Sequence, residues 1–218
     1  VIGGTPIARK NLEWNVNFNL STDKNKVIDL GPNAYLEGTN YAAGLFNNPV
    51  NRVIPGEALG TFCGLKFLGI YQSNEATEAA KYGFKPGDNK YANINNDEKI
   101  DYNDRTVIGH SLPKYTWGLN NTVSYKDFEF NLLLQGVYGN QILNTTYAAA
   151  CTQIGDAATI TSSDVHPWTE SNPSNMWPKI NSSTSKEYIE NSKWLQDGSF
   201  VRVKNLSVAY KVPSKFLN

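Results

Sequence analysis

Apolar and polar residues alternate along several stretches of the chain. In the stretch 14–20, Trp14, Val16, Phe18 and Leu20 take every second position, and asparagines fill the positions between them. Successive side chains of a β-strand point to opposite faces, so this pattern predicts a strand with one apolar and one hydrated face.

The same alternation predicts a β-hairpin in the middle of the chain. It runs through 115–125 and resumes in phase through 128–138, after a turn at Lys126 and Asp127. Two runs of this kind with a two-residue connection are typical of a hairpin.

Other stretches carry weaker forms of these signals. Strands are expected at 61–71 and 200–210, another from a weaker pattern at 25–30, and a single short helix at 74–83. The fold class predicted from the pattern is all-β. Its adjacent antiparallel strands are expected to be 61–71, 115–125, 128–138 and 200–210.

Strand length and aromatic residues leave two architectures open. Strands of about ten residues, tilted by about 45°, have the length that crosses an outer membrane. Aromatic residues at strand ends are typical of the interfacial bands of a membrane barrel. The residues concerned are Trp14, Tyr115, Trp117, Tyr125, Tyr138 and Tyr210. A soluble β-sandwich with one polar face has the same periodicity, so alternation does not separate the two.

Bulk composition excludes some partners. The 218 residues include 20 basic and 20 acidic side chains, so the formal net charge is zero and gives no reason to expect binding to nucleic acid. Cys63 and Cys151 are too few for a disulfide framework and lack metal-site spacing. No apolar run approaches the roughly 18 residues of a membrane helix. Val1 opens no signal peptide, so an outer-membrane origin is expected only for a processed or internal piece.

Two long connections are expected on either side of the hairpin, at 72–114 and 139–198. Connections of this length are unusual in a compact domain and are usually functional. Outer-membrane barrels alternate short periplasmic turns with long extracellular loops. We therefore expect the turn at 126–127 to face the periplasm and both long connections to face outside.

The second connection contains three tryptophans in a polar setting. Trp168, Trp177 and Trp194 lie among many Asn, Ser and Thr residues. An exposed indole stacks on a sugar or a peptide side chain, whereas a buried one packs the interior of its own loop. The first interpretation makes these three residues a substrate-binding set, and the second stays open beside it.

The stretch 93–105, "NINNDEKIDYNDR", has the spacing of a degraded calcium loop. Its candidate ligands are Asn93, Asn95, Asp97, Asp101 and Asp104. Glu98 stands where a calcium loop has its turn glycine, and the last ligand is Asp instead of a bidentate Glu. The alternatives are weak Ca²⁺ binding at 93–104 and a polar turn held by bonds from side chains to the backbone. No cofactor is expected to be required.

Catalytic chemistry is not expected. His110 and His166 are the only histidines, and neither belongs to a metal or nucleophile motif.

Three strings, in order along the chain, resemble the C-terminal barrel of SusC/RagA-type TonB-linked outer-membrane transporters. They are "GEALGTFCGLKFLGIYQ" at 56–72, the stretch 85–140, and "WLQDGSFVRVKNLSVAYKVPSKFL" at 194–217. The middle string matches the family's "IDxxDRxxIG" segment, its Pro, its "WG" strand and its "QGxxG" strand. The matching residues are Ile100, Asp101, Asp104, Arg105, Ile108, Gly109, Pro113, Trp117, Gly118, Phe128, Gln135, Gly136 and Gly139. The last string matches the family's "DGSYLRLKNLTLGY" element and the Pro that follows it, here Asp197 to Tyr210 and Pro213.

The resemblance implies an architecture. It implies that 1–218 is a partial barrel domain of a TonB-dependent receptor, part of a large antiparallel transmembrane β-barrel with long extracellular loops. Such a piece is incomplete at both ends, without the plug domain and without the closing strands. Where the family often has "NGDG", this chain has "NNDE", which favours a structured turn in which Asp101 and Asp104 bond to the backbone or to Arg105.

The resemblance also implies a function. That function is TonB-dependent import of oligomeric nutrients, glycan or peptide, across the outer membrane of a Gram-negative bacterium. The implied partners are a SusD-like surface lipoprotein, a TonB-type energy coupler that acts through the missing N-terminal region, and the lipid bilayer. The alternative is a soluble extracellular carbohydrate-binding β-sandwich that uses the three tryptophans as stacking platforms.

Overall fold

The computed structural model of the chain describes residues 1–39, 48–152, 165–180 and 190–213. These residues form two compact units. The sheet unit takes Val1–Lys24, Leu112–Gln141 and the described residues from Asp197 onward. The insert unit takes the described residues of Asn25–Ser111 and Ile142–Gln196.

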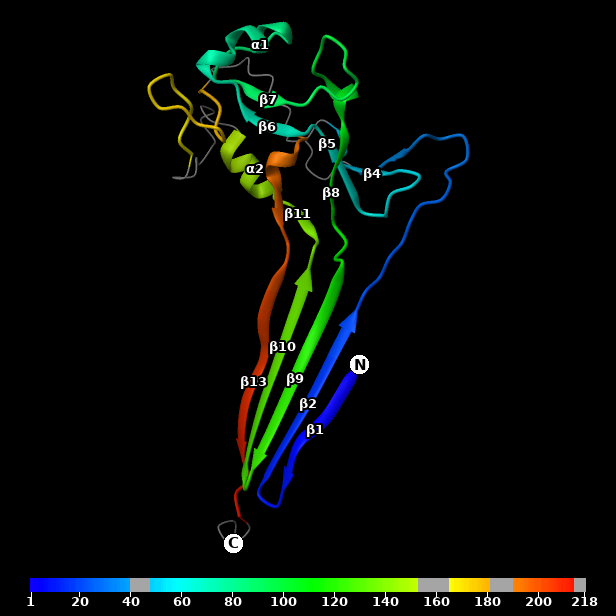
Figure 1. Cartoon of the computed structure of the whole chain (residues 1–218), viewed down its shortest axis with the longest axis vertical. Coiled ribbons are helices and arrows are strands. Elements are labelled where there is room, and N and C mark those ends of the chain that lie inside the picture. The colour runs from blue at the N-terminus through cyan, green and yellow to red at the C-terminus, as the bar shows by residue number, and fades with distance from the viewer. Residues whose placement is uncertain (40–47, 153–164, 181–189, 214–218) are drawn as a thin grey trace. The chain divides into compact units, whose positions relative to one another are not determined.

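The sheet unit is built on one antiparallel sheet with the strand order β1-β2-β9-β10-β13 (Figure 1). Its strands are β1 (Ile2–Arg9), β2 (Leu12–Ser21), β9 (Tyr115–Tyr125), β10 (Phe128–Tyr138) and β13 (Phe200–Tyr210). The strands expected at 14–20, 115–125, 128–138 and 200–210 are therefore confirmed. The alternation was informative there because each of these strands keeps one apolar face. In β13 a register shift moves the apolar positions from Val201 and Val203 to Leu206 and Val208.

Strand β1 was not expected from the sequence. Gly3, Gly4 and Pro6 interrupt its alternation, and its register against β2 shifts between Gly4 and Ile7. Proline has no N–H to donate to a ladder and is tolerated in edge strands and at bulges, which is where Pro6 lies.

The prediction of one strand at 61–71, adjacent to the hairpin, is wrong. The stretch forms two short strands, β5 (Thr61–Gly64) and β6 (Phe67–Ile70), in different sheets of the insert unit. Leu65 and Tyr71 are buried here, and Gly69, with a φ of +124°, lies at a register shift in the pairing of β6 with β7. A run buried on both sides carries no period-two signal that distinguishes one long strand from two short ones. The strand beside β9 is β2.

Two smaller expectations are also corrected. The stretch 25–30 is not a strand, although Val27 exchanges backbone hydrogen bonds with Gly56 and Glu57. The first long connection begins after β2 and ends before β9, so it starts near residue 22 instead of 72. The second, between β10 and β13, is confirmed.

The insert unit consists of short elements. A four-stranded sheet has the order β3-β4-β5-β8, with β3 (Leu36–Glu37), β4 (Asn51–Val53) and β8 (Thr106–His110). Strand β6 pairs with β7 (Asn89–Tyr91). Two further strands, β11 (Gln141–Leu143) and β12 (Leu195–Asp197), pair with each other.

Helices are few and short. The helix expected at 74–83 is present as α1 (Ala76–Lys81), after a 3-10 turn at Ser73–Glu75. Helix α2 (Thr145–Thr152) was not expected. Two more 3-10 turns lie at Tyr102–Asp104 and Ser192–Trp194. Across the described ranges, no helix is long and apolar enough to cross a membrane.

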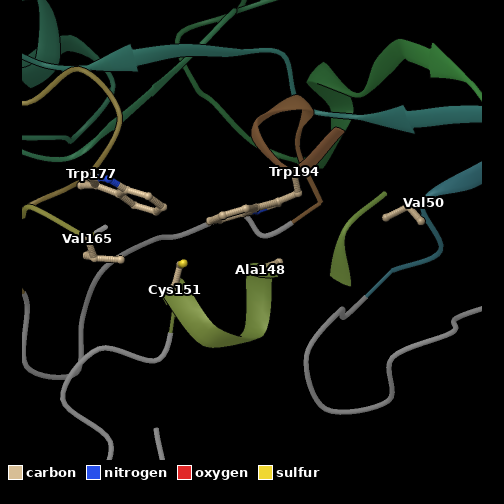
Figure 2. Packing of buried hydrophobic residues seen from close by; sticks show 6 residues of the cluster. All are labelled: Val50, Ala148, Cys151, Val165, Trp177 and Trp194. Carbon is tan, nitrogen blue, oxygen red and sulfur yellow. The ribbon is translucent and has the colours of Figure 1, made fainter. Parts of the chain in front are cut away.

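Two hydrophobic clusters stabilise the insert unit. The tryptophan cluster, shown in Figure 2, consists of Val50, Ala148, Cys151, Val165, Trp177 and Trp194. The tyrosine cluster consists of Leu65, Tyr71, Ala79, Phe84, Tyr91 and Ile100. Residues far apart in sequence meet in each cluster, so both depend on non-local contacts.

Candidate functional site

The five-stranded sheet has one apolar and one polar face. Its register places Phe18, Leu119 and Leu134 in one cross-strand row, and Trp14, Val123 and Phe130 in another. Leu206 and Val208 on β13 continue this apolar face opposite Leu132 and Phe130. The side chains between them, on the opposite face, are mostly amides and hydroxyls.

Several large side chains of the apolar face are exposed in the described part of the chain. Val208, Val201 and Leu206 are 69, 66 and 62 % exposed, and Phe128 is 52 % exposed. A β-sandwich buries such residues against a second sheet about 10 Å away. The exposure of this face therefore opposes the sandwich alternative and indicates a surface made for an apolar medium.

The polar residue Asn121 interrupts the apolar face, and its side chain is hydrogen-bonded there. Asn121 lies between Leu119 and Val123 on β9, and its Oδ1 accepts a hydrogen bond of 3.3 Å from the Trp14 indole Nε1. Pairing of this kind removes most of the cost of an amide in an apolar setting.

Aromatic pairs mark both ends of the apolar face. The rings of Tyr115 and Tyr138 stack with centroids 4.9 Å apart at one end, and those of Phe128 and Tyr210 lie 4.7 Å apart at the other. The ten residue steps from Tyr115 to Tyr125 span about 34 Å along the strand, or about 24 Å at a tilt of about 45°. This height agrees with the apolar band of about 25 Å that an outer-membrane barrel presents to lipid.

The polar face carries few charges and many amides. Asn131 Nδ2 donates to Thr122 Oγ1 at 3.0 Å, and Arg202 Nη2 donates to Gln135 Oε1 at 3.1 Å. Asn15 and its neighbours on β2 extend this surface. Such a face suits water or a polar neighbour.

The short turns β1–β2 and β9–β10 lie at the same end of the strands (Figure 1). The Lys126 N–H donates to Asn11 O at 3.0 Å and the Lys211 N–H donates to Asp127 O at 2.7 Å, which brings the β1–β2 turn, the β9–β10 turn and the end of β13 together. Lys126 has a φ of +54°, as a tight two-residue hairpin turn requires. Both long connections start at the opposite ends of the strands. Short turns at one end and long connections at the other are expected of a barrel sector.

Trp177 and Trp194 are interior residues of the insert unit. They are 7 and 0 % exposed, their ring centroids lie 6.4 Å apart, and the Tyr147 ring packs edge-on against both. The Lys193 ammonium lies 4.7 Å from the centre of the Trp177 ring and 4.8 Å from that of Trp194. In Figure 2 the two indoles lie over Ala148 and Cys151 of α2.

Trp168 holds the loop 165–180 against the rest of the insert unit. It is 9 % exposed, and its indole Nε1 donates to Gln72 Oε1 at 2.9 Å. Its ring lies against Gly87, where a Cβ would come within 2.6 Å of it. The burial of all three tryptophans favours the loop-packing interpretation, and substrate stacking stays a prediction.

The Asn/Asp stretch forms a turn held by its own side chains. Asp97 Oδ1 accepts from the Lys99 N–H at 2.8 Å, and Asn95 Oδ1 accepts from the Asp97 N–H at 3.0 Å. Asn93 Nδ2 donates to the Asp97 carbonyl. These are the side-chain-to-backbone bonds expected of the polar-turn alternative.

Asp104 is the central acceptor of this turn. It is fully buried, and it accepts from the N–H groups of Ile94 at 2.7 Å, Asn95 at 3.4 Å and Asp101 at 2.9 Å. Asp101 in turn accepts from the Asn103 N–H at 2.7 Å. The family-based expectation of backbone bonds at Asp101 and Asp104 is confirmed. In the described part of the chain no three His, Cys, Asp or Glu side chains form a group that could hold a metal, and Ca²⁺ binding stays a prediction.

A charged cluster around the buried Arg105 was not predicted from the sequence. Glu37 Oε1 lies 2.8 Å from an Arg52 guanidinium nitrogen and 3.5 Å from one of Arg105. Arg105 also donates to the Pro49 carbonyl. Its side chain is only 3 % exposed, and burial, followed by repulsion from Arg52, lowers the pKa of Arg105. No local motif signals this cluster, because its members come from three distant segments.

Glu190 also links segments that are far apart in sequence, and this role was not predicted from the sequence. It is fully buried, and its carboxylate accepts from the Asn48 N–H at 2.7 Å and the Tyr102 hydroxyl at 3.1 Å. The Glu190 carbonyl accepts from the Leu65 N–H at 2.8 Å. This carboxylate therefore connects the second long connection to the first.

Comparisons with known proteins agree with this architecture. No family model matches the chain. It is 32 % identical over 223 residues to TonB-dependent receptor P3 of Formosa agariphila, covering 99 % of this chain and 21 % of that protein. It is 31 % identical over 213 residues to TonB-dependent receptor P26 of the same organism, covering 96 % of this chain and 21 % of that protein.

Solved structures share the fold. The structure of the RagAB peptide transporter matches with a TM-score of 0.73 at 17 % identity, over 98 % of this chain and 22 % of that one. The RagAB peptide importer in its open-open state matches with a TM-score of 0.69 at 16 % identity, over 99 % of this chain and 22 % of that one. The chain thus spans about a fifth of the length of the proteins it matches.

Proposed function

This chain is homologous to one part of the TonB-dependent receptors, which lie in the outer membrane of Gram-negative bacteria, and we propose that it serves energised import of an oligomeric nutrient. The observation that carries the proposal is the two-faced sheet, with its exposed apolar face bounded by aromatic pairs. The nutrient is an oligosaccharide or a peptide. The protein that contains this chain acts as a transporter and not as an enzyme.

The two faces of the sheet have separate roles in this proposal. The apolar face, with Leu206 and Val208, contacts lipid. The polar face, with Thr122, Asn131 and Gln135, faces the lumen. An open sheet leaves unpaired backbone groups at its edge strands, which hydrocarbon does not tolerate. We therefore propose that residues 1–218 form one sector of a barrel domain that the remaining four fifths of a full-length receptor complete.

The insert unit is the part that we propose to contact cargo or a lid outside the cell. The connections that form it leave the sheet at the edge opposite the short turns, which supports an extracellular position for it. Cargo stacking by Trp168, Trp177 or Trp194 stays a prediction, and it requires a rearrangement that exposes their rings.

The proposed partners follow from the same homology. A TonB-type coupler supplies energy through a region outside this chain, and a SusD-like surface lipoprotein covers the extracellular mouth. One structural neighbour is the RagAB peptide transporter, and this likeness supports the proposal of a lipoprotein partner.

Uptake by the source bacterium tests the proposal. The gene for the full-length protein is deleted, and uptake of fluorescently labelled oligosaccharide and peptide mixtures is compared in the wild type, the deletion strain, the complemented strain and a strain lacking the TonB coupler. We expect uptake of one cargo class to disappear in both mutants and to return on complementation. Uptake that is unchanged in the deletion strain for every mixture contradicts the proposal.

A further inference from the structure

The insert unit contains an open cleft that none of the roles above uses. It has a volume of about 430 Å³ and lies between β6, α1, β7 and the turn at 93–97. Three tyrosines form its aromatic lining: Tyr71, Tyr82 and Tyr91. The turn contributes Asn93, Asn96 and Asp97. The cleft therefore combines aromatic rings with amides within one unit.

The aromatic side of the cleft is held rigidly. Tyr71 stacks on Phe84 with ring centroids 5.9 Å apart, and Tyr91 packs edge-on against Phe67 at 6.2 Å. Tyr71 and Tyr91 are almost completely buried, whereas Tyr82 is half-buried beside the same cluster. Tyr82 thus offers accessible ring surface on a pre-organised base, which lowers the entropic cost of binding.

The charged side chains that line the cleft already form ion pairs or hydrogen bonds within the protein. Lys90 Nζ lies 2.5 Å from Glu75 Oε1, and Glu78 pairs with Lys81 at 2.8 Å. Both oxygens of Asp97 accept hydrogen bonds, from the Lys99 N–H and from Asn95 Nδ2, each at 2.8 Å. An ionic ligand would have to displace one of these partners, so the cleft favours an uncharged one.

The amide side chains that line the cleft are those of Asn93 and Asn96. The buried Asn93 Oδ1 has no hydrogen-bond partner among the described residues. Asn96 has a φ of +58°, a left-handed conformation that is uncommon outside glycine, although asparagine tolerates it better than most residues. Strained backbone conformations of this kind occur frequently at binding sites.

We propose that this cleft binds an uncharged sugar unit of the cargo. The Tyr82 ring packs on the apolar C–H face of the sugar, and the exposed Asn96 amide hydrogen-bonds its hydroxyl groups. Aromatic rings supply contact area at low entropic cost, and amides both donate and accept, as a hydroxyl-rich ligand requires. The inference rests on the proposed import function and narrows its cargo to a neutral oligosaccharide.

Binding to the purified full-length receptor tests this assignment. The probes are an array of neutral oligosaccharides, including malto-, xylo- and laminari-hexaose, beside charged oligosaccharides and a peptide mixture. The variants are Tyr82→Ala, which removes the ring, and Asn96→Gly, which removes the amide while permitting the positive φ. The control is Tyr35→Ala, which removes an exposed tyrosine of the same unit that packs on Arg52, outside the cleft.

We expect at least one neutral oligosaccharide to bind, with a loss of at least tenfold in affinity for Tyr82→Ala, a smaller loss for Asn96→Gly and none for Tyr35→Ala. Limited proteolysis confirms that each variant is folded. Binding only to peptides or charged glycans overturns the inference, as does unchanged binding in folded Tyr82→Ala. Either result leaves the import function intact if uptake of that cargo still requires the gene and the TonB coupler.

Discussion

The two units of this chain bury their apolar residues in opposite ways. Every buried hydrophobic residue in the described ranges belongs to the insert unit, among them Leu65, Tyr71 and Trp194. The sheet unit instead exposes large apolar side chains such as Leu206 and Val208. The insert unit is therefore packed like a water-soluble domain, whereas the sheet unit depends on an apolar surrounding. The chain therefore joins a unit with a buried apolar core to a unit with an exposed apolar face. Each of the following substitutions tests one of these two units.

The largest effect is expected in the insert unit, for Trp194→Ala. Trp194 is fully buried against Trp177 and Tyr147, so its removal leaves a cavity that we expect to cost about 3–5 kcal/mol of the free energy of unfolding. The measurement is proteolysis of the insert unit in the purified full-length receptor as a function of urea concentration. Leu206→Ala on the exposed sheet face is the matched control and should leave this profile unchanged.

The same receptor tests whether Trp194 also contacts cargo. A Trp194→Ala protein that remains folded in the absence of urea should bind cargo normally if the residue only packs the loop. Loss of cargo binding without any change in the urea profile contradicts the packing interpretation and supports stacking.

A second prediction compares the two faces of one strand. Leu206 lies near the middle of the apolar face and its neighbour Asn205 lies on the polar face. Leu206→Arg should destabilise the assembled barrel by about 2–4 kcal/mol, because a charge at the bilayer midplane is costly, and Asn205→Arg by about 0–1 kcal/mol. Urea unfolding of the receptor reconstituted in lipid vesicles measures both. Equal effects at the two positions contradict the assignment of the faces.

A third prediction separates the polar turn from an ion site. Asp104→Asn replaces an acceptor of three backbone N–H groups and turns a donor toward one of them, so we expect a loss of about 1–3 kcal/mol. Asp97 is exposed, so Asp97→Asn should cost only about 0–0.5 kcal/mol. Urea unfolding of the full-length receptor is measured with Ca²⁺ and with a chelator. A loss at Asp104 that is the same in both conditions supports the turn, whereas stabilisation of the unmodified protein by Ca²⁺ supports an ion site.

The sheet unit could be predicted from the sequence, because its two faces differ in polarity. This difference imposes a period of two on β2, β9 and β10, and on the parts of β13 before and after its register shift. Only β1 was missed, where two glycines and Pro6 interrupt the alternation. The hairpin positions were clear for the same reason: Lys126 and Asp127 are the only residues between two runs that stay in phase.

The insert unit could not be predicted in the same way. Its strands are short, and most of the stretch 61–71 is buried, so this stretch has a nearly continuous apolar run without a period. The carboxylate of Glu190 and the pair of Arg105 with Glu37 join segments far apart in sequence, and no local pattern indicates such contacts. The exposure of a tryptophan is likewise a property of its tertiary neighbours, so the sequence left both interpretations of Trp168 and Trp194 open.

A further prediction concerns pH and Tyr71, which lines the cleft. Burial, followed by repulsion from Glu78, raises the pKa of Tyr71 to about 12, whereas that of an unfolded tyrosine is 10.0. Because the folded pKa is the higher one, the neutral phenol stabilises the insert unit fully below pH 10 and progressively less as the pH rises from 10 toward 12. Stability of the full-length receptor, followed by proteolysis across this window, should therefore fall less steeply in Tyr71→Phe than in the unmodified protein. Tyr35→Phe, at an exposed site, should not change the slope, and identical slopes for Tyr71→Phe and the unmodified protein would show that the Tyr71 hydroxyl is not held in a buried setting.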